Sequence, residues 1–234
     1  MTLRRGQVMD APWDEAGAPP PSPRSPLPGL RWPLVSWTLL GGSVLATLAS
    51  MQQPELVQRT ALYGPSVEAG QWYRLLSTVF MHGNLLHLFM NMSAVYTLGI
   101  QLERAVGSLR TLYVSSASAL GAGAFVLLFG YGLPTVGASG VLCGFLGAML
   151  PIATRAGRRW IWTTVLQIAL VSLLPMVSWQ GHLGGFAFGF VAGLLLRLPR
   201  QLFLPLSVAL LSGVAAVTVW SSGQQGRFSV GQRR

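Results

Sequence analysis

The chain has 234 residues, of which 51% are hydrophobic and only 9% are charged. Soluble domains carry roughly 25% charged residues, so this composition excludes an ordinary soluble enzyme and predicts a polytopic membrane protein. The net charge is +10, but the arginines lie in short clusters between apolar segments, which is typical of cytoplasmic loops and does not favour nucleic-acid binding.

The first 30 residues are rich in proline, arginine, alanine and glycine and lack the apolar pattern of a folded domain. Such a segment cannot bury enough apolar surface to fold, so we expect residues 1–30 to form a disordered cytoplasmic tail. We expect residues 31–200 to form a membrane core and residues 201–221 an additional transmembrane helix. Residues 222–234 are expected to be a polar C-terminal tail.

Seven apolar segments follow the tail, and each is close to the roughly 20 residues that a helix needs to cross the hydrocarbon core. The expected spans cover residues 33–51, 84–101, 111–130, 138–154, 160–177, 182–198 and 202–220. This pattern predicts an all-α polytopic membrane protein with six core helices and a seventh, C-terminal transmembrane helix.

All 16 basic residues are arginine, and most of them fall on the side of the membrane that holds the N-terminus. Cytoplasmic loops carry such an excess of positive charge, so we expect a cytoplasmic N-terminus. The even-numbered spans then begin at the outer face. We expect a multi-pass protein of a bacterial cell membrane.

The few polar side chains that could do chemistry fall at one depth of the membrane. His82 and His87 lie at the start of the second expected span, Ser139 at the start of the fourth and His182 at the start of the sixth. All of these spans begin at the outer face, so the four side chains share the outer leaflet. Polar and ionisable groups at membrane depth are costly and usually mark a function.

Small residues indicate how these spans pack. Gly185 and Gly189 lie three and seven residues after His182 and share its helical face. Gly140 and the glycines after it form a second stripe beside Ser139. Small residues at this spacing let membrane helices approach closely. If the two stripes face each other, Ser139 and His182 come within hydrogen-bond reach.

A serine and a histidine in this arrangement favour nucleophilic catalysis. The Ser139 hydroxyl is a weak nucleophile until a base such as His182 removes its proton. No Asp or Glu lies in an expected span near the site, so we predict a Ser–His dyad without a third member. The backbone N–H of Ser139 has no partner within its helix, and Asn91 and His87 can add side-chain donors for an oxyanion.

The sequence resembles the rhomboid family of intramembrane serine proteases, over roughly residues 72–193. Five segments carry the resemblance and occur in the order of the family's motifs. They are "WYR" (Trp72, Tyr73, Arg74), "HGNLLHLFMN" (His82 to Asn91), "ERAVG" (Glu103 to Gly107), "GASG" (Gly137 to Gly140) and "GHLGG" (Gly181 to Gly185). Each segment is a weak signal alone, but the five in order are specific.

The resemblance implies a six-helix core with a water-filled cavity that opens to the outer face. It implies Ser139 as nucleophile, His182 as general base, and Asn91 and His87 near the oxyanion. The implied substrates are single-span membrane proteins, cut near the outer end of their transmembrane helix. The implied first loop, with Trp72, lies partly in the bilayer as a structural wedge. Neither a cofactor nor a metal is implied, and no oligomeric state is predicted.

One position departs from the family pattern. Four residues after the nucleophile, the family commonly has an aromatic residue that stacks on the base, whereas this chain has Cys143. As the only cysteine, it also excludes an internal disulfide. The resemblance then leaves His182 less firmly held, or held by another ring such as Phe145 or Phe186.

Other functions remain open on the residues alone. A transporter or channel usually places charged residues at the membrane midplane and has internal repeats, and neither occurs here. A rhomboid-like pseudoenzyme would bind membrane clients without cutting them, although such relatives typically lack the serine or the histidine. A three-histidine metal site is disfavoured, because a spacing of five turns His82 and His87 away from each other on a helix. Singly, Ser139 also fits a helix cap, and Glu103 fits an ion pair with Arg104 or a helix end.

Overall fold

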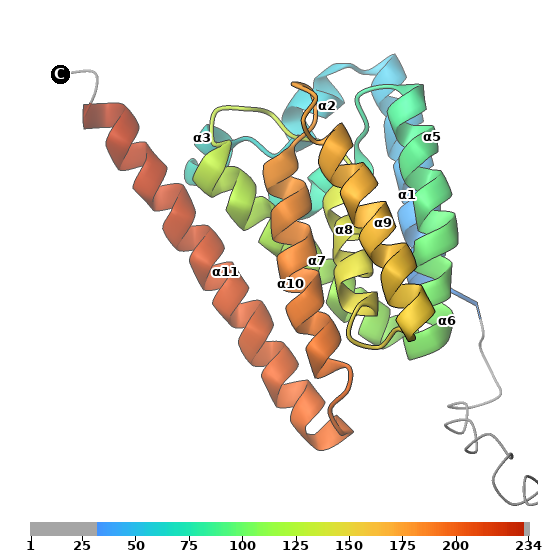
Figure 1. Ribbon diagram of the computed structural model, residues 1–234. Helices are drawn as coiled ribbons and strands as arrows, with labels where there is room; N and C mark the ends of the chain where they lie inside the picture. Colours follow the sequence, from blue (N-terminus) through green and yellow to red (C-terminus); the bar gives the residue numbers. More distant parts are fainter. Residues whose placement is uncertain (1–31, 232–234) are drawn as a thin grey trace, which may run out of the picture. The chain divides into compact units, whose positions relative to one another are not determined.

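The computed structural model describes residues 32–231, so the tail expected over residues 1–30 lies outside the described residues. The chain from Pro33 onward forms one compact unit. Its elements in chain order are α1 (Leu34–Gln52), α2 (Glu55–Thr60), α3 (Gly64–Glu68), α4 (Arg74–Ser77), η1 (Thr78–Phe80), α5 (Leu85–Ala94), η2 (Val95–Gly99), α6 (Ile100–Val106), α7 (Ser108–Phe129), α8 (Ser139–Met149), α9 (Arg155–Val171), α10 (Trp179–Leu195) and α11 (Arg200–Gly231) (Figure 1).

The predicted all-α polytopic fold is confirmed, and helical structure lies in each of the seven expected spans, although the helix in the fourth span is short. Four helical stretches are long and apolar enough to cross a membrane: Leu34–Gln52, Leu85–Val106, Ser108–Phe129 and Gln201–Trp220. The second of these is α5, a π-helical turn (η2) and α6 in one continuous run. α11 continues to Gly231, so most of the segment expected as a polar tail is helical. The expected division of the chain into domains stays a prediction.

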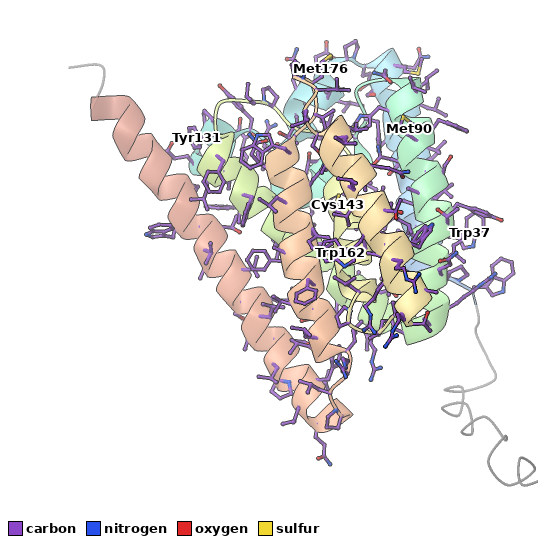
Figure 2. All side chains as sticks on the ribbon, in the orientation of Figure 1. Trp37, Met90, Tyr131, Cys143, Trp162 and Met176 are labelled. Atoms are coloured by element: carbon purple, nitrogen blue, oxygen red, sulfur yellow. The ribbon has the colours of Figure 1, made fainter. Side chains whose placement is uncertain are left out.

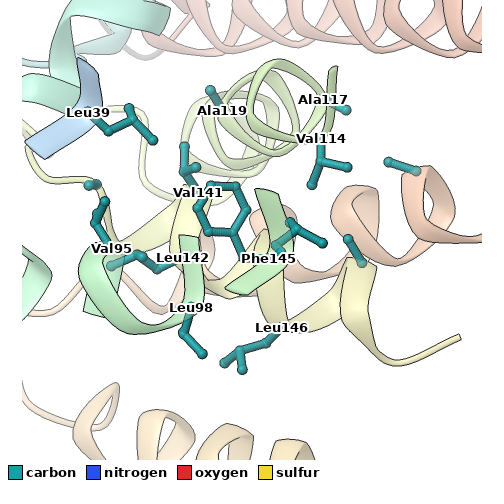
Figure 3. Close-up of a cluster of buried hydrophobic side chains, with 14 of the residues drawn as sticks. Leu39, Val95, Leu98, Val114, Ala117, Ala119, Val141, Leu142, Phe145 and Leu146 are labelled. Atoms are coloured by element: carbon teal, nitrogen blue, oxygen red, sulfur yellow. The ribbon is translucent and has the colours of Figure 1, made fainter. Parts of the chain in front are cut away.

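The central helix is α8, and it is short. It has 11 residues, which is roughly 16 Å at 1.5 Å per residue, about half of the hydrocarbon core. Every residue from Gly140 to Ala148 is buried. Phe145 is fully buried at the centre of the core, where Val141, Leu142 and Leu146 of the same helix surround it (Figure 3).

The neighbours of α8 differ in how tightly they pack. α10 lies against both α8 and α7, and α11 runs along α7 (Figure 1). α9 lies at the edge of the unit, and Ile161 is its only buried residue. Trp162 of α9 is exposed over half of its surface, and its ring is 6.1 Å from that of Phe186 (Figure 2).

Glu103 holds the start of α1 in place. Its carboxylate accepts hydrogen bonds from the backbone N–H groups of Val35 (2.9 Å) and Ser36 (2.8 Å) and from the Ser36 hydroxyl (2.7 Å). The first N–H groups of a helix have no partner inside it, and a carboxylate there also interacts well with the helix dipole. Glu103 is therefore a cap for a helix far away in sequence and not the ion-pair partner of Arg104. Gly107 follows, with a φ of 87° that separates α6 from α7.

Candidate active site

The loop between α1 and α5 is built around a buried arginine. Arg74 donates from Nε to Gln71 Oε1 (2.8 Å) and from Nη1 to the carbonyls of Gln58 (2.7 Å) and Ala61 (2.8 Å). Arg74 is only 6% exposed, and these bonds hold α2 and α4 together. Trp72, in contrast, is 38% exposed. Arg74 is thus a structural centre of this loop.

The loop between α1 and α5 is joined to the segment that leads into α8. Leu62 and Thr135 exchange two backbone hydrogen bonds of 2.9 Å, and the Thr78 hydroxyl donates to the Thr135 carbonyl at 2.6 Å. The Tyr131 hydroxyl donates to the Glu68 carboxylate. Burial and this carboxylate raise the pKa of Tyr131, so its hydroxyl stays neutral and remains a donor. The segment that leads into α8 is therefore held in place by hydrogen bonds to the loop between α1 and α5.

Gly137 makes the turn into α8. Its φ of 123° lies in a region that favours glycine, and its N–H donates to the Thr78 carbonyl at 3.0 Å. A Cβ built on Gly137 would lie 2.9 Å from His87 Nε2 and 3.9 Å from Ser139 Oγ. The missing side chain lets the His87 ring lie over this turn, so His87 and Ser139 both border Gly137.

The glycine stripes of α8 and α10 face each other. A Cβ on Gly185 would lie 2.0 Å from the carbonyl oxygen of Gly140, and one on Gly189 would lie 2.2 Å from that of Gly144. One on Gly140 would lie 3.2 Å from the carbonyl oxygen of Gly181. The backbones are in direct contact near the N-terminal ends of the two helices. Ser139 and His182 are the chain neighbours of Gly140 and Gly181, so they lie on adjoining turns.

The hydrogen bond that the stripes led us to expect between Ser139 and His182 is not formed among the described residues. Instead, the Nδ1 atom of His182 lies 2.7 Å from the hydroxyl oxygen of Ser172, at the C-terminal end of α9. Both Ser139 and His182 are partly exposed. The ring of His182 is therefore held by the end of a neighbouring helix and not by Ser139.

Asn91 and His87 lie on the same face of α5, as their spacing predicts. Asn84 caps this helix by accepting the His87 N–H at 2.8 Å. Asn91 Nδ2 donates to the His87 carbonyl at 2.9 Å and keeps a second hydrogen, while its Oδ1 has no protein partner although the side chain is buried. A buried amide with an unused donor and an unsatisfied acceptor suits a site that a ligand completes.

His82 connects the loop between α1 and α5 to both of these helices. It is 2% exposed, its Nδ1 is 3.5 Å from the Thr47 hydroxyl, and its ring centroid is 5.0 Å from that of His87. Burial, with a smaller contribution from nearby His87, lowers the pKa of His82 to about 4, so it is neutral at pH 7. Within residues 32–231, no group of three or more His, Cys, Asp and Glu residues is arranged to hold a metal ion.

Two features of the site were not visible in the sequence. Ser172 looked like one more small polar residue in an apolar segment, and only the end position of α9 brings it to His182. No ring contact to His182 is formed by Phe145 or Phe186 among the described side chains, since Phe145 is fully buried in the core and Phe186 packs on Trp162. Cys143 is also buried inside the unit (Figure 2).

Comparisons with known proteins give one consistent family. A profile of the Rhomboid domain matches residues 69–199. The rhomboid protease GluP of Bacillus subtilis (strain 168) is 32% identical over 142 residues, covering 57% of this chain and 28% of that protein. RHOMBOID-like protein 5 of Arabidopsis thaliana is 37% identical over 163 residues, covering 63% of this chain and 52% of that protein.

A relative described as inactive also matches. Inactive RHOMBOID-like protein 8 of Arabidopsis thaliana is 27% identical over 123 residues, covering 49% of this chain and 35% of that protein. The chain thus spans between 28% and 52% of the length of these three relatives. The profile covers more than half of the chain, and its range includes all five motif segments and the helices that carry them. This multi-pass membrane protein belongs to the rhomboid family.

Proposed function

We propose that the protein is an intramembrane serine endopeptidase that cleaves single-span membrane proteins near the outer end of their transmembrane helix. The nucleophile is Ser139 and the general base is His182. The observation that carries the proposal is the backbone contact between α8 and α10 at Gly140, Gly181 and Gly185, which sets the serine and the histidine on adjoining turns. The presence of a protease among the relatives supports the same chemistry.

In the proposed reaction, His182 accepts the hydroxyl proton of Ser139 while Oγ attacks the carbonyl carbon of the scissile peptide bond. The resulting tetrahedral intermediate carries a negative oxygen. It collapses as the C–N bond breaks, and the imidazolium returns the proton to the leaving amine. Water then hydrolyses the acyl-enzyme by the same proton transfers and regenerates Ser139. No cofactor or metal is needed at any step.

The charge on the intermediate needs hydrogen-bond donors. The Ser139 backbone N–H lies in the first turn of α8, where a helix has no acceptor for it. We assign the second hydrogen of Asn91 Nδ2 and the ring of His87 as further donors. Both come from α5, and His87 already lies over the turn at Gly137.

Asn91→Ala should lower kcat by about 10²–10³, because a donor aimed at the oxyanion acts mainly in the transition state. KM should change little. The measurement is steady-state cleavage of a reconstituted single-span substrate, with thermal unfolding as a check that α5 still forms. A change in KM with an unchanged kcat would contradict the assignment of Asn91 as an oxyanion donor.

The distribution of charge supports a cytoplasmic N-terminus. Arginines gather at one end of the unit, where α6 meets α7, α8 leads to α9 and α10 leads to α11 (Figure 1). They are Arg104, Arg110, Arg155, Arg158, Arg159 and Arg197. Ser139 and His182 begin their helices at the opposite end. With the arginines inside, the site opens to the outer face of a bacterial cell membrane. The proposed partners are the lipid bilayer and single-span substrates, with no role for nucleic acid.

A rhomboid-like pseudoenzyme that holds membrane clients is the second candidate. The observation that favours it is the absence of a hydrogen bond between Ser139 and His182 within the described part of the chain. Catalytic hydrogen bonds are, however, often long before a substrate binds and tighten in its complex. Retention of both the serine and the histidine therefore favours the protease.

Labelling with a fluorophosphonate, followed by peptide mapping, tests the proposal without knowledge of the natural substrate. We expect covalent modification of Ser139 in the wild-type protein and none in His182→Ala, because the reaction needs an activated hydroxyl. The other serines serve as internal controls in the same sample. Absence of label in folded wild-type protein, or equal label in His182→Ala, would favour the pseudoenzyme.

A further inference from the structure

A hydroxyl at the outer end of α9 is the one described group that hydrogen bonds to the imidazole ring of His182. Ser172 directly follows α9, is 9% exposed, and holds its Oγ 2.7 Å from His182 Nδ1. The same Oγ donates to the carbonyl oxygen of Ile168 at 2.7 Å. The serine thus stands between the last turn of one helix and the base carried by the next.

The hydrogens of this cluster can be placed from what each atom is able to do. A carbonyl oxygen only accepts, so the bond to Ile168 uses the single proton of the Ser172 hydroxyl. The Ser172 oxygen must then accept from His182, which puts the ring proton on Nδ1. A neutral imidazole carries one N–H, and Nε2 is therefore left with its lone pair. A base needs this tautomer in order to take a proton through Nε2.

We propose that Ser172 is the positioning residue of His182: by accepting the Nδ1 hydrogen, it orients the ring and leaves Nε2 as the proton acceptor for Ser139. This inference rests on the proposed function. It gives Ser172 the place of the carboxylate in a Ser–His–Asp triad, which fixes the tautomer and orientation of its histidine. When Nε2 takes the proton of Ser139, the Nδ1 hydrogen stays in its bond to Ser172, so this bond lasts through the transfer.

Two further observations support this role. Among the described side chains, no aromatic ring packs on the His182 imidazole, so no stacking contact can replace the hydrogen bond. The segment between α9 and α10 is exposed, and Met176 within it is 95% exposed (Figure 2). The linker therefore does not hold the two helix ends together by burial, and the bond from Ser172 to His182 joins them directly.

The competing explanation is that Ser172 only completes the end of α9. Serine and threonine hydroxyls commonly bond to the carbonyl four residues earlier in a helix. Thr164, also on α9, does this with the Trp160 carbonyl at 3.1 Å and is far from any histidine in sequence. Thr164→Ala therefore serves as a matched control, because it removes a back-bonded hydroxyl from α9 and leaves the His182 contact in place.

Only three histidines occur in the chain, so ring ¹⁵N labelling gives three resolvable sets of signals. We would record them for detergent-solubilised protein at about pH 8, where a histidine of ordinary pKa is neutral, and assign His182 from the signals lost in His182→Ala. Wild-type protein and Thr164→Ala should show His182 as the Nδ1–H tautomer. Ser172→Ala should show a mixture of tautomers at His182 alone, and Ser172→Thr should restore the wild-type signal.

The rate at which fluorophosphonate labels Ser139 should be highest in the variants whose His182 is the Nδ1–H tautomer. We expect a loss of about tenfold or more in Ser172→Ala, recovery in Ser172→Thr, and no change in Thr164→Ala. A wild-type His182 protonated on Nε2 would overturn the proposal, and so would a Ser172→Ala variant with unchanged signals and rate. Wild-type protein that shows the Nδ1–H tautomer but never labels would overturn the proposed function and leave the tautomer assignment standing.

Discussion

Cleavage of a single-span membrane substrate is expected to fall below detection in both Ser139→Ala and His182→Ala. In serine hydrolases, loss of the nucleophile or of its base lowers kcat by a factor on the order of 10⁶. The two groups act as one unit, so the double variant should be no slower than either single variant. Cleavage is measured in liposomes with the purified protein, and product formation is followed over many hours.

These variants should leave the fold intact, which separates a chemical from a structural effect. Ser139 and His182 are both partly exposed, and neither is part of the buried hydrophobic cluster around Phe145. Unfolding temperatures close to wild type are therefore expected. A cleavage rate in the double variant far below that of both single variants would show that the two side chains act independently. Cleavage at the wild-type rate in either single variant would contradict the assignment of Ser139 and His182 as a catalytic dyad.

Gly185→Ala should damage both stability and activity, because the added methyl has no space. Its Cβ would lie 2.0 Å from the carbonyl oxygen of Gly140, which belongs to the backbone and cannot rotate away as a flexible side chain can. α8 and α10 would have to separate. Overpacking a well-packed site costs typically about 1–3 kcal/mol, and separation here also pulls His182 away from Ser139.

The matched control is Gly41→Ala on α1, which has no atom within 4 Å of its added Cβ. It makes the same chemical change in a helix and should leave the unfolding temperature and the labelling of Ser139 near wild type. Gly185→Ala should lower the unfolding temperature by several degrees and slow the labelling. Equal behaviour of the two variants would mean that the tight contact between α8 and α10 does not matter for the site.

The spans and the glycine contacts could be predicted because they depend on local composition and spacing. Apolar length marks a helix in a membrane, and glycines on one face mark a close approach such as that between Gly144 and Gly189. The partners of single polar groups could not be predicted in this way. Glu103 caps a helix that begins 69 residues earlier, at Leu34, and nothing in its own surroundings indicates that.

In the candidate site, too, the sequence predicted which residues come together but not their hydrogen-bond partners. The motif segments indicated which residues gather at one end of the helices, and the structure sets Ser139, His87 and His182 on neighbouring elements at that end. Their detailed hydrogen bonding was not predictable, because it depends on where α9 ends relative to α10. Ser172 reaches the ring of His182 because it directly follows the last turn of α9. Catalytic roles for these residues stay predictions until the variants are measured.

The short central helix also has a consequence for how lipids could influence this protein. α8 is enclosed by protein from Gly140 to Ala148, so its length need not match the thickness of the bilayer, whereas exposed helices such as α11 must match it. The depth of Ser139 in the bilayer is then determined by the packing of α8 against neighbouring helices and not by contact of α8 with the lipid headgroups. If the proposed protease function holds, a thicker or thinner bilayer would shift a single-span substrate relative to Ser139, and bilayer thickness would then affect which of its peptide bonds lies next to the hydroxyl.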